Sequence, residues 1–320
     1  MSWQSAFACW FLRRQFYPQT LSPTISVEHA RKTTAKRIWS PRVPRGWVLR
    51  EQYGIDDAPL RGEWLEPLAA PKRPAPARTI LYFHGGGYYF CSPRSHRSLV
   101  FELARRANTR TFSLDYRLAP EHRFPAALDD SVAAYRQLLA AGTPAESIVI
   151  AGDSAGGGLA LATLVALRDA GDALPAGGLL FSPWTDLAAT GETIRTNDGV
   201  DPMFSGPAVA RAAQVYLGYT PATHPYASPL YAGLHSLPPL FVQAGSTEVL
   251  LDDARRVAER ARTAGVSVAF EIWPNMPHAW QIYAPFIPES RKALDGAAAF
   301  VNQVTAPSAS QPSSATSIAL

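Results

Sequence analysis

Residues 152–156 read Gly-Asp-Ser-Ala-Gly and place a serine between two glycines, after a strand-like segment and before a helix-like one. A G-x-S-x-G pattern at such a junction is typical of a nucleophile elbow, a sharp turn that exposes a serine hydroxyl at the end of a sheet. The glycines have no side chain to obstruct the turn. We therefore expect Ser154 to act as a nucleophile.

A base must activate this serine, because an unassisted hydroxyl is a weak nucleophile. In folds that carry the elbow, the expected order along the chain is serine, acid, histidine. His278 fits this order, since it ends the segment Pro-Asn-Met-Pro-His (274–278), a loop that follows a predicted strand. The other histidines precede the elbow or lie away from a strand end: His29, His84, His96, His122, His224 and His235.

Three acidic residues compete to orient His278, namely Glu248, Asp252 and Asp253. Glu248 lies in the loop proper, three residues after the strand-like segment 239–245. Asp252 and Asp253 begin a helix-like segment, where a carboxylate serves to cap backbone N–H groups. Capping accounts for the two aspartates and leaves Glu248 unexplained, so the sequence favours Glu248 as the acid that holds the imidazole.

Residues 84–87 read His-Gly-Gly-Gly after another apolar, strand-like segment. Consecutive glycines mark a place where the backbone approaches something closely. The phosphate-binding patterns G-x-x-x-x-G-K-[ST] and G-x-G-x-x-G are absent here. Attack by a serine on an ester carbonyl creates an oxyanion, which needs N–H donors about 3 Å away. We expect Ala155 and the glycines 85–87 to supply these N–H groups.

Strand-like and helix-like segments alternate from residue 46 onward and must position these groups. Such alternation with short connections predicts an α/β fold with a mostly parallel sheet covered by helices on both faces. Residues 46–54 and 61–67 are typical of an opening hairpin, and a proline-rich loop follows at 67–78. Further strands are expected at 79–85, 109–116, 147–154, 177–184, 239–245 and 266–273. Helices are expected at 94–107, 125–142, 155–171, 252–265 and 289–304.

Two stretches fall outside this alternation, and insertions of this kind often cover an active site. Residues 1–45 precede the first strand, and residues 189–225 separate two strands with a short helix at 207–219. The Ser-, Ala- and Pro-rich residues 305–320 are predicted to be disordered. Internal repeats are absent.

Near the start of the chain, Trp3, Phe7, Trp10 and Phe11 recur at helical spacing and form one face of an amphipathic helix. We expect this face to dock on the rest of the protein, and contact with a membrane or a lipid substrate is the alternative. The apolar run is short and its arginines follow it, which argues against a signal peptide. No stretch is long and apolar enough to span a bilayer, so we expect no stable membrane insertion.

Composition narrows the classes of function. With 47% hydrophobic residues, 18% charged residues and a formal net charge of +4 over 320 residues, the chain has a soluble, globular composition. Basic residues gather in 31–50, but no nucleic-acid-binding signature accompanies them, so we expect a solvated surface and no nucleic-acid partner. The two cysteines, Cys9 and Cys91, lack metal-ligand spacing and predict no disulfide scaffold, which favours a reducing, cytoplasmic location.

Taken together, these residues resemble the hormone-sensitive lipase-like branch of the α/β-hydrolases, also called bacterial family IV esterases. The matching blocks, in the family's order, are HGGGYYFCSPRSHR, LDYRLAPEHRFPAALDD, GDSAGGGLA, SPWTDL, EVLLDD and PHAW. The resemblance covers about residues 45–303. It implies an α/β-hydrolase fold with a helical cap, in which Ser154 is the nucleophile and His278 the base. It also implies that Gly85, Gly86 and Ala155 donate the oxyanion N–H groups.

One position departs from the family's pattern. The family usually has Asp-Pro-Leu-x-Asp where this chain reads Glu-Val-Leu-Leu-Asp at 248–252. Alignment of the leucine and the last aspartate puts Glu248 at the catalytic position, in agreement with the choice made from the residues alone. The resemblance further implies that there is no metal and no organic cofactor. Family members are often homodimers.

The resemblance also divides the chain. It implies a cap made of residues 1–45 and 189–225 over a hydrolase core made of residues 46–188 and 226–304. Asp115 and Tyr116 are expected to fasten the loop beneath the active site. Five further side chains are candidates for an apolar pocket wall, although each would suit a core equally well: Tyr88, Trp184, Met203, Phe204 and Trp280.

The function favoured by these features is that of a serine carboxylic-ester hydrolase that acts on a small-molecule ester through an acyl-enzyme. A pocket of limited depth under a two-segment cap predicts acyl chains of about four to eight carbons. Lactones, such as a monoterpene ε-lactone, and steroid esters are alternative substrates. A remote alternative is a non-catalytic receptor similar to the plant gibberellin receptors, which lack the catalytic histidine that this chain has at His278.

Overall fold

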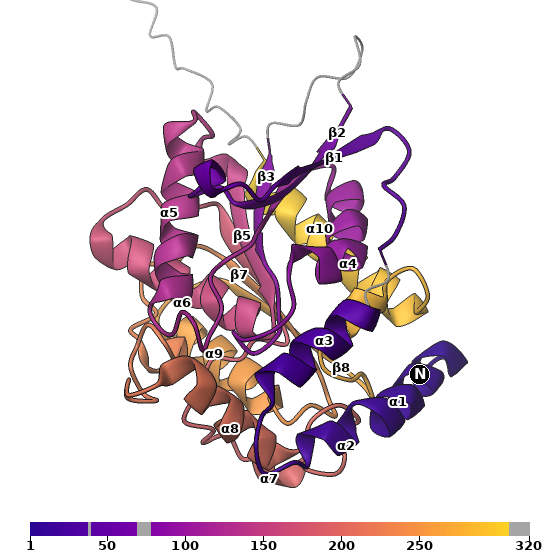
Figure 1. Cartoon of the computed structure of the whole chain (residues 1–320). Helices are drawn as coiled ribbons and strands as arrows, with labels where there is room; N and C mark the ends of the chain where they lie inside the picture. The colour runs from indigo at the N-terminus through magenta and orange to yellow at the C-terminus, as the bar shows by residue number, and fades with distance from the viewer. Residues whose placement is uncertain (38–39, 69–77, 307–320) are drawn as a thin grey trace, which may run out of the picture.

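An eight-stranded β-sheet forms the centre of the molecule (Figure 1). The structure, a computed structural model, describes residues 1–37, 40–68 and 78–306. The strand order is β1-β2-β4-β3-β5-β6-β7-β8. β1 pairs antiparallel with β2, and β2 with β4, whereas all other neighbours are parallel. The strands are β1 (Trp47–Gln52), β2 (Gly62–Pro67), β3 (Thr79–Phe83), β4 (Arg110–Leu114), β5 (Ile148–Asp153), β6 (Gly177–Phe181), β7 (Leu240–Gly245) and β8 (Val268–Trp273).

Helices cover both faces of this sheet, which confirms the prediction from the alternating segments. Side chains of one strand alternate between the two faces, because successive residues of a strand point in opposite directions. In β3, Leu81 and Phe83 join the core under α5, α6 and α9, whereas Ile80 and Tyr82 join the core under α4 and α10. The helices are α4 (Pro93–Ala107), α5 (Ala126–Ala140), α6 (Ala155–Ala170), α9 (Leu251–Thr263) and α10 (Pro288–Val304).

The helices of the two segments outside the alternation lie in the lower half of the molecule as it is drawn in Figure 1. They contact each other, since the carbonyl oxygen of Thr20 accepts hydrogen bonds from Ser205 Oγ at 2.9 Å and from Arg211 Nη2 at 2.6 Å. The helices of these segments are α1 (Trp3–Gln15), α2 (Tyr17–Thr20), α3 (Val27–Arg37), α7 (Thr193–Thr196) and α8 (Gly206–Leu217).

The aromatic face of α1 is oriented opposite to the prediction. Trp3, Phe7 and Trp10 are 76%, 59% and 53% exposed, whereas the buried residues of α1 are Ser5 and Leu12. The expectation that the aromatic face docks on the protein is therefore wrong. The periodicity located a helix and its apolar face, but the face that packs against the protein is the one that carries Ser5 and Leu12.

Several remaining expectations concern the chain as a whole. The proline-rich loop at 67–78 and the tail at 305–320 lie almost entirely outside the described residues. In the part of the chain that the structure describes, no helix has the length and apolarity to cross a membrane. The same part holds no cluster of three or more His, Cys, Asp or Glu side chains that could bind a metal ion. Cys9 and Cys91 are free thiols.

Candidate active site

Ser154 stands at the junction of β5 and α6, where the chain turns sharply. Its φ of 53° and ψ of −124° are unfavourable for a residue with a side chain, so the surrounding structure must hold them. A Cβ on Gly152 would lie 2.2 Å from the carbonyl oxygen of Gly156, and a Cβ on Gly156 would lie 2.1 Å from that of Phe83. Both positions therefore require glycine, which is the physical reason for the G-x-S-x-G spacing.

Glu248 and His278 meet in a buried hydrogen bond. They follow β7 and β8, and these neighbouring parallel strands deliver both side chains to the same edge of the sheet. His278 Nδ1 lies 2.7 Å from Glu248 Oε2. The other carboxylate oxygen accepts hydrogen bonds from Ser182 Oγ at 2.7 Å and from the N–H of Gly245. Ser182 Oγ accepts in turn from the N–H of Ala279 at 3.1 Å, which fixes the loop that carries the imidazole.

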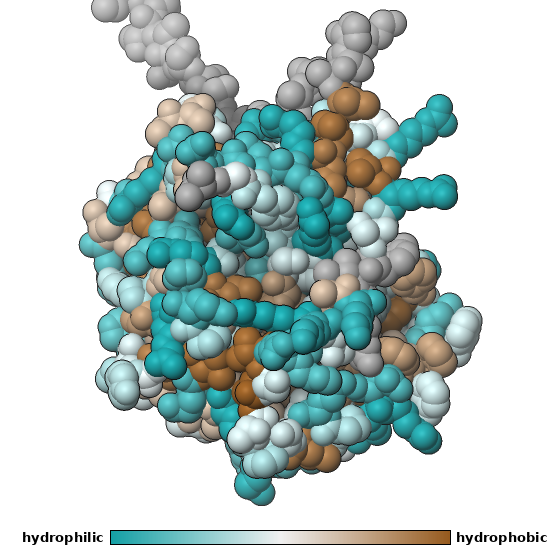
Figure 2. Space-filling view, viewed as in Figure 1, coloured by the Kyte–Doolittle hydropathy of each residue, from teal (hydrophilic) through white to brown (hydrophobic). Residues whose placement is uncertain are grey.

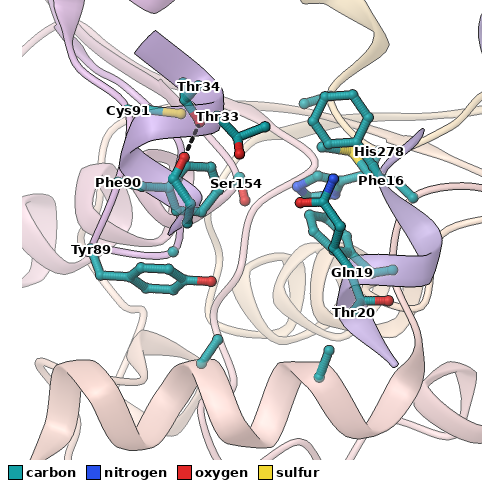
Figure 3. A pocket seen from close by; sticks show the side chains of 18 of the residues that line it. Phe16, Gln19, Thr20, Thr33, Thr34, Tyr89, Phe90, Cys91, Ser154 and His278 are labelled. Atoms are coloured by element: carbon teal, nitrogen blue, oxygen red, sulfur yellow. Dashed lines mark hydrogen bonds between the residues drawn. The ribbon is translucent and has the colours of Figure 1, made fainter. Parts of the chain in front are cut away.

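The second ring nitrogen of His278 is open. Among the described residues, the buried Nε2 has no hydrogen-bond partner. Ser154 and His278 line the same cavity, and Figure 3 shows both side chains at this pocket. Burial lowers the pKa of His278, but the hydrogen bond and the charge of Glu248 outweigh burial and raise the pKa above its ordinary value. An imidazole held through Nδ1, with Nε2 open, is arranged to accept a proton.

Asp252 and Asp253 bind the part of the chain that follows β6, and neither of them binds His278. Asp252 accepts a hydrogen bond from the N–H of Thr193 at 3.0 Å, and Asp253 accepts one from the N–H of Thr185 at 2.7 Å. The expectation that these carboxylates cap their own helix is wrong, since the backbone N–H groups that they bind belong to Thr193 and Thr185 and not to α9. They fasten the chain that follows β6 instead. Neither aspartate shares a hydrogen bond with the imidazole.

In the glycine loop, residues 84–87, one of the predicted oxyanion donors is wrong. The N–H of Gly85 donates to Asp153 Oδ1 at 3.0 Å, so it is not available to an oxyanion. Gly86 and Gly87 have φ of 113° and 58°, a region that favours glycine, and both line the cavity. Ala155 is the first residue of α6, so its N–H lacks a partner within the helix. Within the described chain, the N–H groups of Gly86, Gly87 and Ala155 donate to no protein acceptor.

Asp153, the residue before Ser154, anchors the glycine loop to the elbow. Besides the N–H of Gly85, its carboxylate accepts the Tyr82 hydroxyl at 2.6 Å and lies 3.2 Å from His96 Nε2. Burial raises the pKa of Asp153, but the interactions with His96 and Tyr82 outweigh burial and lower it overall. A buried carboxylate thus joins β3, α4 and the elbow. Reasoning from the sequence missed this role, although an acid beside the nucleophile was an available signal.

A second anchor lies at the carbonyl group that precedes the glycines. Tyr116 donates its hydroxyl hydrogen bond to the carbonyl oxygen of His84 at 2.7 Å, and the two rings stack with centroids 4.3 Å apart. Burial lowers the pKa of His84 to about 3, so this imidazole is neutral. Tyr116 thus fastens the loop as expected. Asp115 does not take part, because its carboxylate pairs with Arg61 at 3.0 Å.

The cavity at Ser154 and His278 has a volume of about 590 Å³. Residues within 16–34 and within 203–212 line it, so both segments outside the alternation contribute to its wall. In Figure 2, apolar side chains (brown) gather in the lower half of this face beside the hydrophilic side chains over α3. In Figure 3, Phe16, Gln19 and Thr20 of the first segment lie near His278.

The five candidates for the pocket wall divide into two groups. Trp184, Met203 and Phe204 line the cavity, and Phe204 meets the His278 ring edge-on with centroids 5.1 Å apart. Tyr88 and Trp280 lie in the core instead, which corrects the prediction for these two. Tyr88 is 2% exposed and stacks on Tyr216 with centroids 3.8 Å apart. Trp280 is completely buried and packs against Met276 and Ala293.

The segment 189–225 also holds the loop of Glu248. Asn197 Nδ2 donates to the carbonyl oxygen of Glu248 at 2.8 Å, and Asp201 Oδ2 accepts from the N–H of Val249 at 2.9 Å. Burial raises the pKa of Asp201 to about 6. Reasoning from the sequence missed Asn197 and Asp201, because hydrophobic patterns do not report hydrogen bonds between a side chain and a distant backbone.

Comparison with known proteins agrees with this geometry. Residues 80–282 match the protein family described as alpha/beta hydrolase fold. The chain is 46% identical over 243 residues to an acetyl-hydrolase of Streptomyces hygroscopicus, a match that covers 76% of this chain and 80% of the relative. A crystal structure of an esterase from the bacterial hormone-sensitive lipase family superposes with a TM-score of 0.85 at 39% identity, covering 95% of this chain and 99% of that chain. The protein belongs to the hormone-sensitive lipase family of α/β-hydrolases.

This membership confirms the fold and the family predicted from the motif blocks. Another structure, of EstE5 from a crystal soaked with p-nitrophenyl butyrate, superposes with a TM-score of 0.85 at 37% identity and covers 96% of this chain and 100% of that one. Further relatives bear the names esterase and carboxylesterase. As a hormone-sensitive lipase family member with these relatives, the protein is an esterase.

Proposed function

We propose that the protein hydrolyses carboxylic esters through a covalent acyl-enzyme formed on Ser154. The main observation behind the proposal is the hydrogen bonding of the two ring nitrogens of His278. Its Nδ1 is hydrogen-bonded to Glu248, and its Nε2, beside the cavity that Ser154 also lines, has no partner in the described part of the chain. This combination supplies a nucleophile, a base and an acid that orients the base.

In the proposed acylation, Ser154 Oγ attacks the ester carbonyl carbon while His278 Nε2 takes the hydroxyl proton. The carbonyl oxygen becomes an oxyanion, and the N–H groups of Gly86, Gly87 and Ala155 stabilise its charge. Glu248 stays ionised and stabilises the imidazolium that forms. The intermediate collapses, the bond from the carbonyl carbon to the alcohol oxygen breaks, and His278 returns its proton to the departing alcohol.

In the proposed deacylation, a water molecule replaces the alcohol. His278 Nε2 removes a proton from this water as its oxygen attacks the acyl carbon, and the same N–H groups stabilise the second oxyanion. The bond from the acyl carbon to Ser154 Oγ then breaks, and the imidazolium protonates the serine. The products are a carboxylic acid and an alcohol, and the enzyme is unchanged.

We propose that residues 1–45 and 189–225 form a cap over this site and that the substrate is a small ester. Both segments line the 590 Å³ cavity, a volume within the range of about 300–1,000 Å³ usual for small-molecule pockets. A cavity of this size supports acyl chains of about four to eight carbons. The name of the acetyl-hydrolase relative supports a short acyl group as well. The free thiols Cys9 and Cys91 support the proposed cytoplasmic location.

Hydrolysis of p-nitrophenyl butyrate by the purified protein and its Ser154→Ala variant tests the proposal. We expect the variant to lose at least about 10³-fold in kcat, since it lacks the hydroxyl that is proposed to attack the ester. Equal rates for the two proteins would exclude Ser154 as the nucleophile. The receptor alternative predicts no turnover by either protein, and the intact pair of Glu248 and His278 argues against it.

A further inference from the structure

Helix α1 presents a stripe of exposed aromatic side chains. Trp3, Phe7 and Trp10 recur every three or four residues, so they lie on one side of the helix. They are 76%, 59% and 53% exposed, and the rings of Phe7 and Trp10 stack with centroids 5.6 Å apart. Scattered exposed aromatic residues are ordinary on a protein surface, but a contiguous stripe marks a site of interaction.

The opposite side of α1 is fastened to the body of the protein. Glu289, at the start of α10, accepts hydrogen bonds from the N–H of Ser2 at 2.5 Å and from Ser5 Oγ at 2.9 Å. At the other end of the helix, Arg13 donates to the carbonyl oxygens of Gly199 and Val200 at 2.8 and 2.7 Å. Bonds at both ends fix the rotation of α1 about its axis. The aromatic stripe therefore faces outward because of the way the helix is attached.

The charge beside the stripe is positive. Arg14 continues the spacing of Trp3, Phe7 and Trp10, is exposed, and places its guanidinium 5.6 Å from the centroid of the Trp10 ring. Residues 1–27 contain no Asp or Glu. The stripe thus combines tryptophan and phenylalanine rings with a cation and no acidic residue. Two copies of the helix brought face to face would set like charges against each other.

We propose that this stripe, defined by Trp3, Phe7, Trp10 and Arg14, docks the protein on an anionic lipid bilayer surface. Indole and phenyl rings partition into the boundary between lipid headgroups and acyl chains, and arginine is attracted to anionic headgroups. The helix lies on the surface and does not cross it.

The proposed surface is continuous with the wall of the cavity. α2 begins two residues after α1 ends, and Phe16, between the two helices, lines the cavity. Phe11 and Phe16 meet edge-on with centroids 6.3 Å apart, which links α1 to this wall. Docking through α1 therefore holds the cavity close to the lipid surface, from which an apolar ester could reach it. The docking itself does not depend on the proposed reaction.

Co-sedimentation of the full-length protein with lipid vesicles tests the proposal. One set of vesicles contains phosphatidylglycerol and phosphatidylcholine, and the other contains phosphatidylcholine alone. We expect the affinity for the anionic vesicles to be at least about tenfold higher and to fall with added salt. The triple variant Trp3→Gln, Phe7→Gln, Trp10→Gln should lose at least about tenfold of this affinity, and Arg14→Gln should lose part of it. Tyr219→Gln, at a fully exposed aromatic residue elsewhere, is the matched control and should bind as the wild type does.

Three results would overturn the proposal. The first is a wild-type protein that sediments with neither kind of vesicle, and the second is a triple variant that binds like the wild type. The third is a wild-type protein that dimerises without lipid and becomes monomeric in the triple variant, which would assign the stripe to a second copy of the chain. Unchanged thermal unfolding and unchanged hydrolysis of p-nitrophenyl acetate by the triple variant establish that it folds, because the stripe lies outside the cavity.

Discussion

Glu248 Oε2 lies 2.7 Å from Nδ1 of His278, while Nε2 on the other side of the same ring has no partner among the residues that the structure describes. This relationship gives the ring two distinct ends, one fixed by a carboxylate and one open to the cavity. The hydrogen bond to Nδ1 selects the tautomer whose Nε2 is unprotonated. A serine near that nitrogen can therefore transfer its proton to it.

Glu248→Gln tests the role of this carboxylate. The amide keeps nearly the same shape, but it provides no negative charge for the developing imidazolium. We expect kcat for p-nitrophenyl butyrate to fall by about 10³- to 10⁴-fold with the fold intact. Asp252→Asn is the matched control: it weakens the ion pair with Arg255, should cost about 1 kcal/mol of stability, and should leave kcat within about threefold. A folded but inactive Asp252→Asn beside a normal Glu248→Gln would move the acid to Asp252.

The pH dependence of kcat/KM should report the titration of His278. Because Glu248 raises the pKa of this imidazole, the base is protonated and inactive over a wider range of acidic pH than a free histidine would be. We expect the acidic limb of the profile to have its midpoint above about 6.5, the ordinary value for histidine. In Glu248→Gln burial remains as the largest influence on the pKa of His278, opposed by the charges of Asp201 and Asp153, so the limb should move to lower pH while the plateau falls. A midpoint that stays in place in the variant would contradict this cause of the shift.

Asp153→Asn should weaken catalysis by loosening the glycine loop. The change removes the charge that holds Gly85, Tyr82 and His96 together. We expect kcat to fall by about 10- to 100-fold with a nearly constant KM, because oxyanion stabilisation acts in the transition state. A boronic acid that mimics the tetrahedral intermediate should bind correspondingly more weakly. Tyr82→Phe, which removes one of the three contacts, should give a smaller effect in the same direction. Loss of stability alone, with normal kcat and normal inhibitor binding, would contradict the positioning role.

The parts of the site that the sequence could predict are those that short motifs encode. Gly152 and Gly156 are required by contacts within a few residues of Ser154 or with the neighbouring strand, so the motif and the strand before it suffice to locate the elbow. His278 and Glu248 each follow a recognisable strand of a parallel sheet. The order of these strands along the chain is therefore enough to bring the two residues together.

Other features depend on directions and distant contacts that a pattern of residue types does not contain. The run of three glycines does not say which N–H points into the cavity, and Asp153 decides this by engaging Gly85. The periodicity of α1 identifies its aromatic face, but the bonds to Glu289 decide that this face is exposed. Tyr88 stacks on Tyr216, far away in the sequence, so its place in the core was not predictable from its neighbours.

Acyl-chain selectivity should respond to the size of the residues on α8. Ala208 lines the cavity, and Ala208→Phe adds a ring to a space of about 590 Å³. We expect the wild type to be most active on acyl chains of about four to eight carbons, and the variant to lose at least about tenfold more kcat/KM on octanoate than on acetate esters. The measurement is a series of p-nitrophenyl esters of increasing acyl length. Wild-type activity that rises steadily to long-chain substrates would contradict a cavity of this size.

Direct detection of the acyl-enzyme is the most direct test of the proposed mechanism. The protein is mixed with p-nitrophenyl butyrate, quenched in acid within the first turnovers, digested and mapped by mass spectrometry. The mechanism predicts a butyryl group on the peptide that contains Ser154, together with a burst of about one p-nitrophenol per active site where deacylation limits the rate. Ser154→Ala should show neither. An unmodified Ser154 peptide in every quenched sample, with hydrolysis retained by Ser154→Ala, would contradict it.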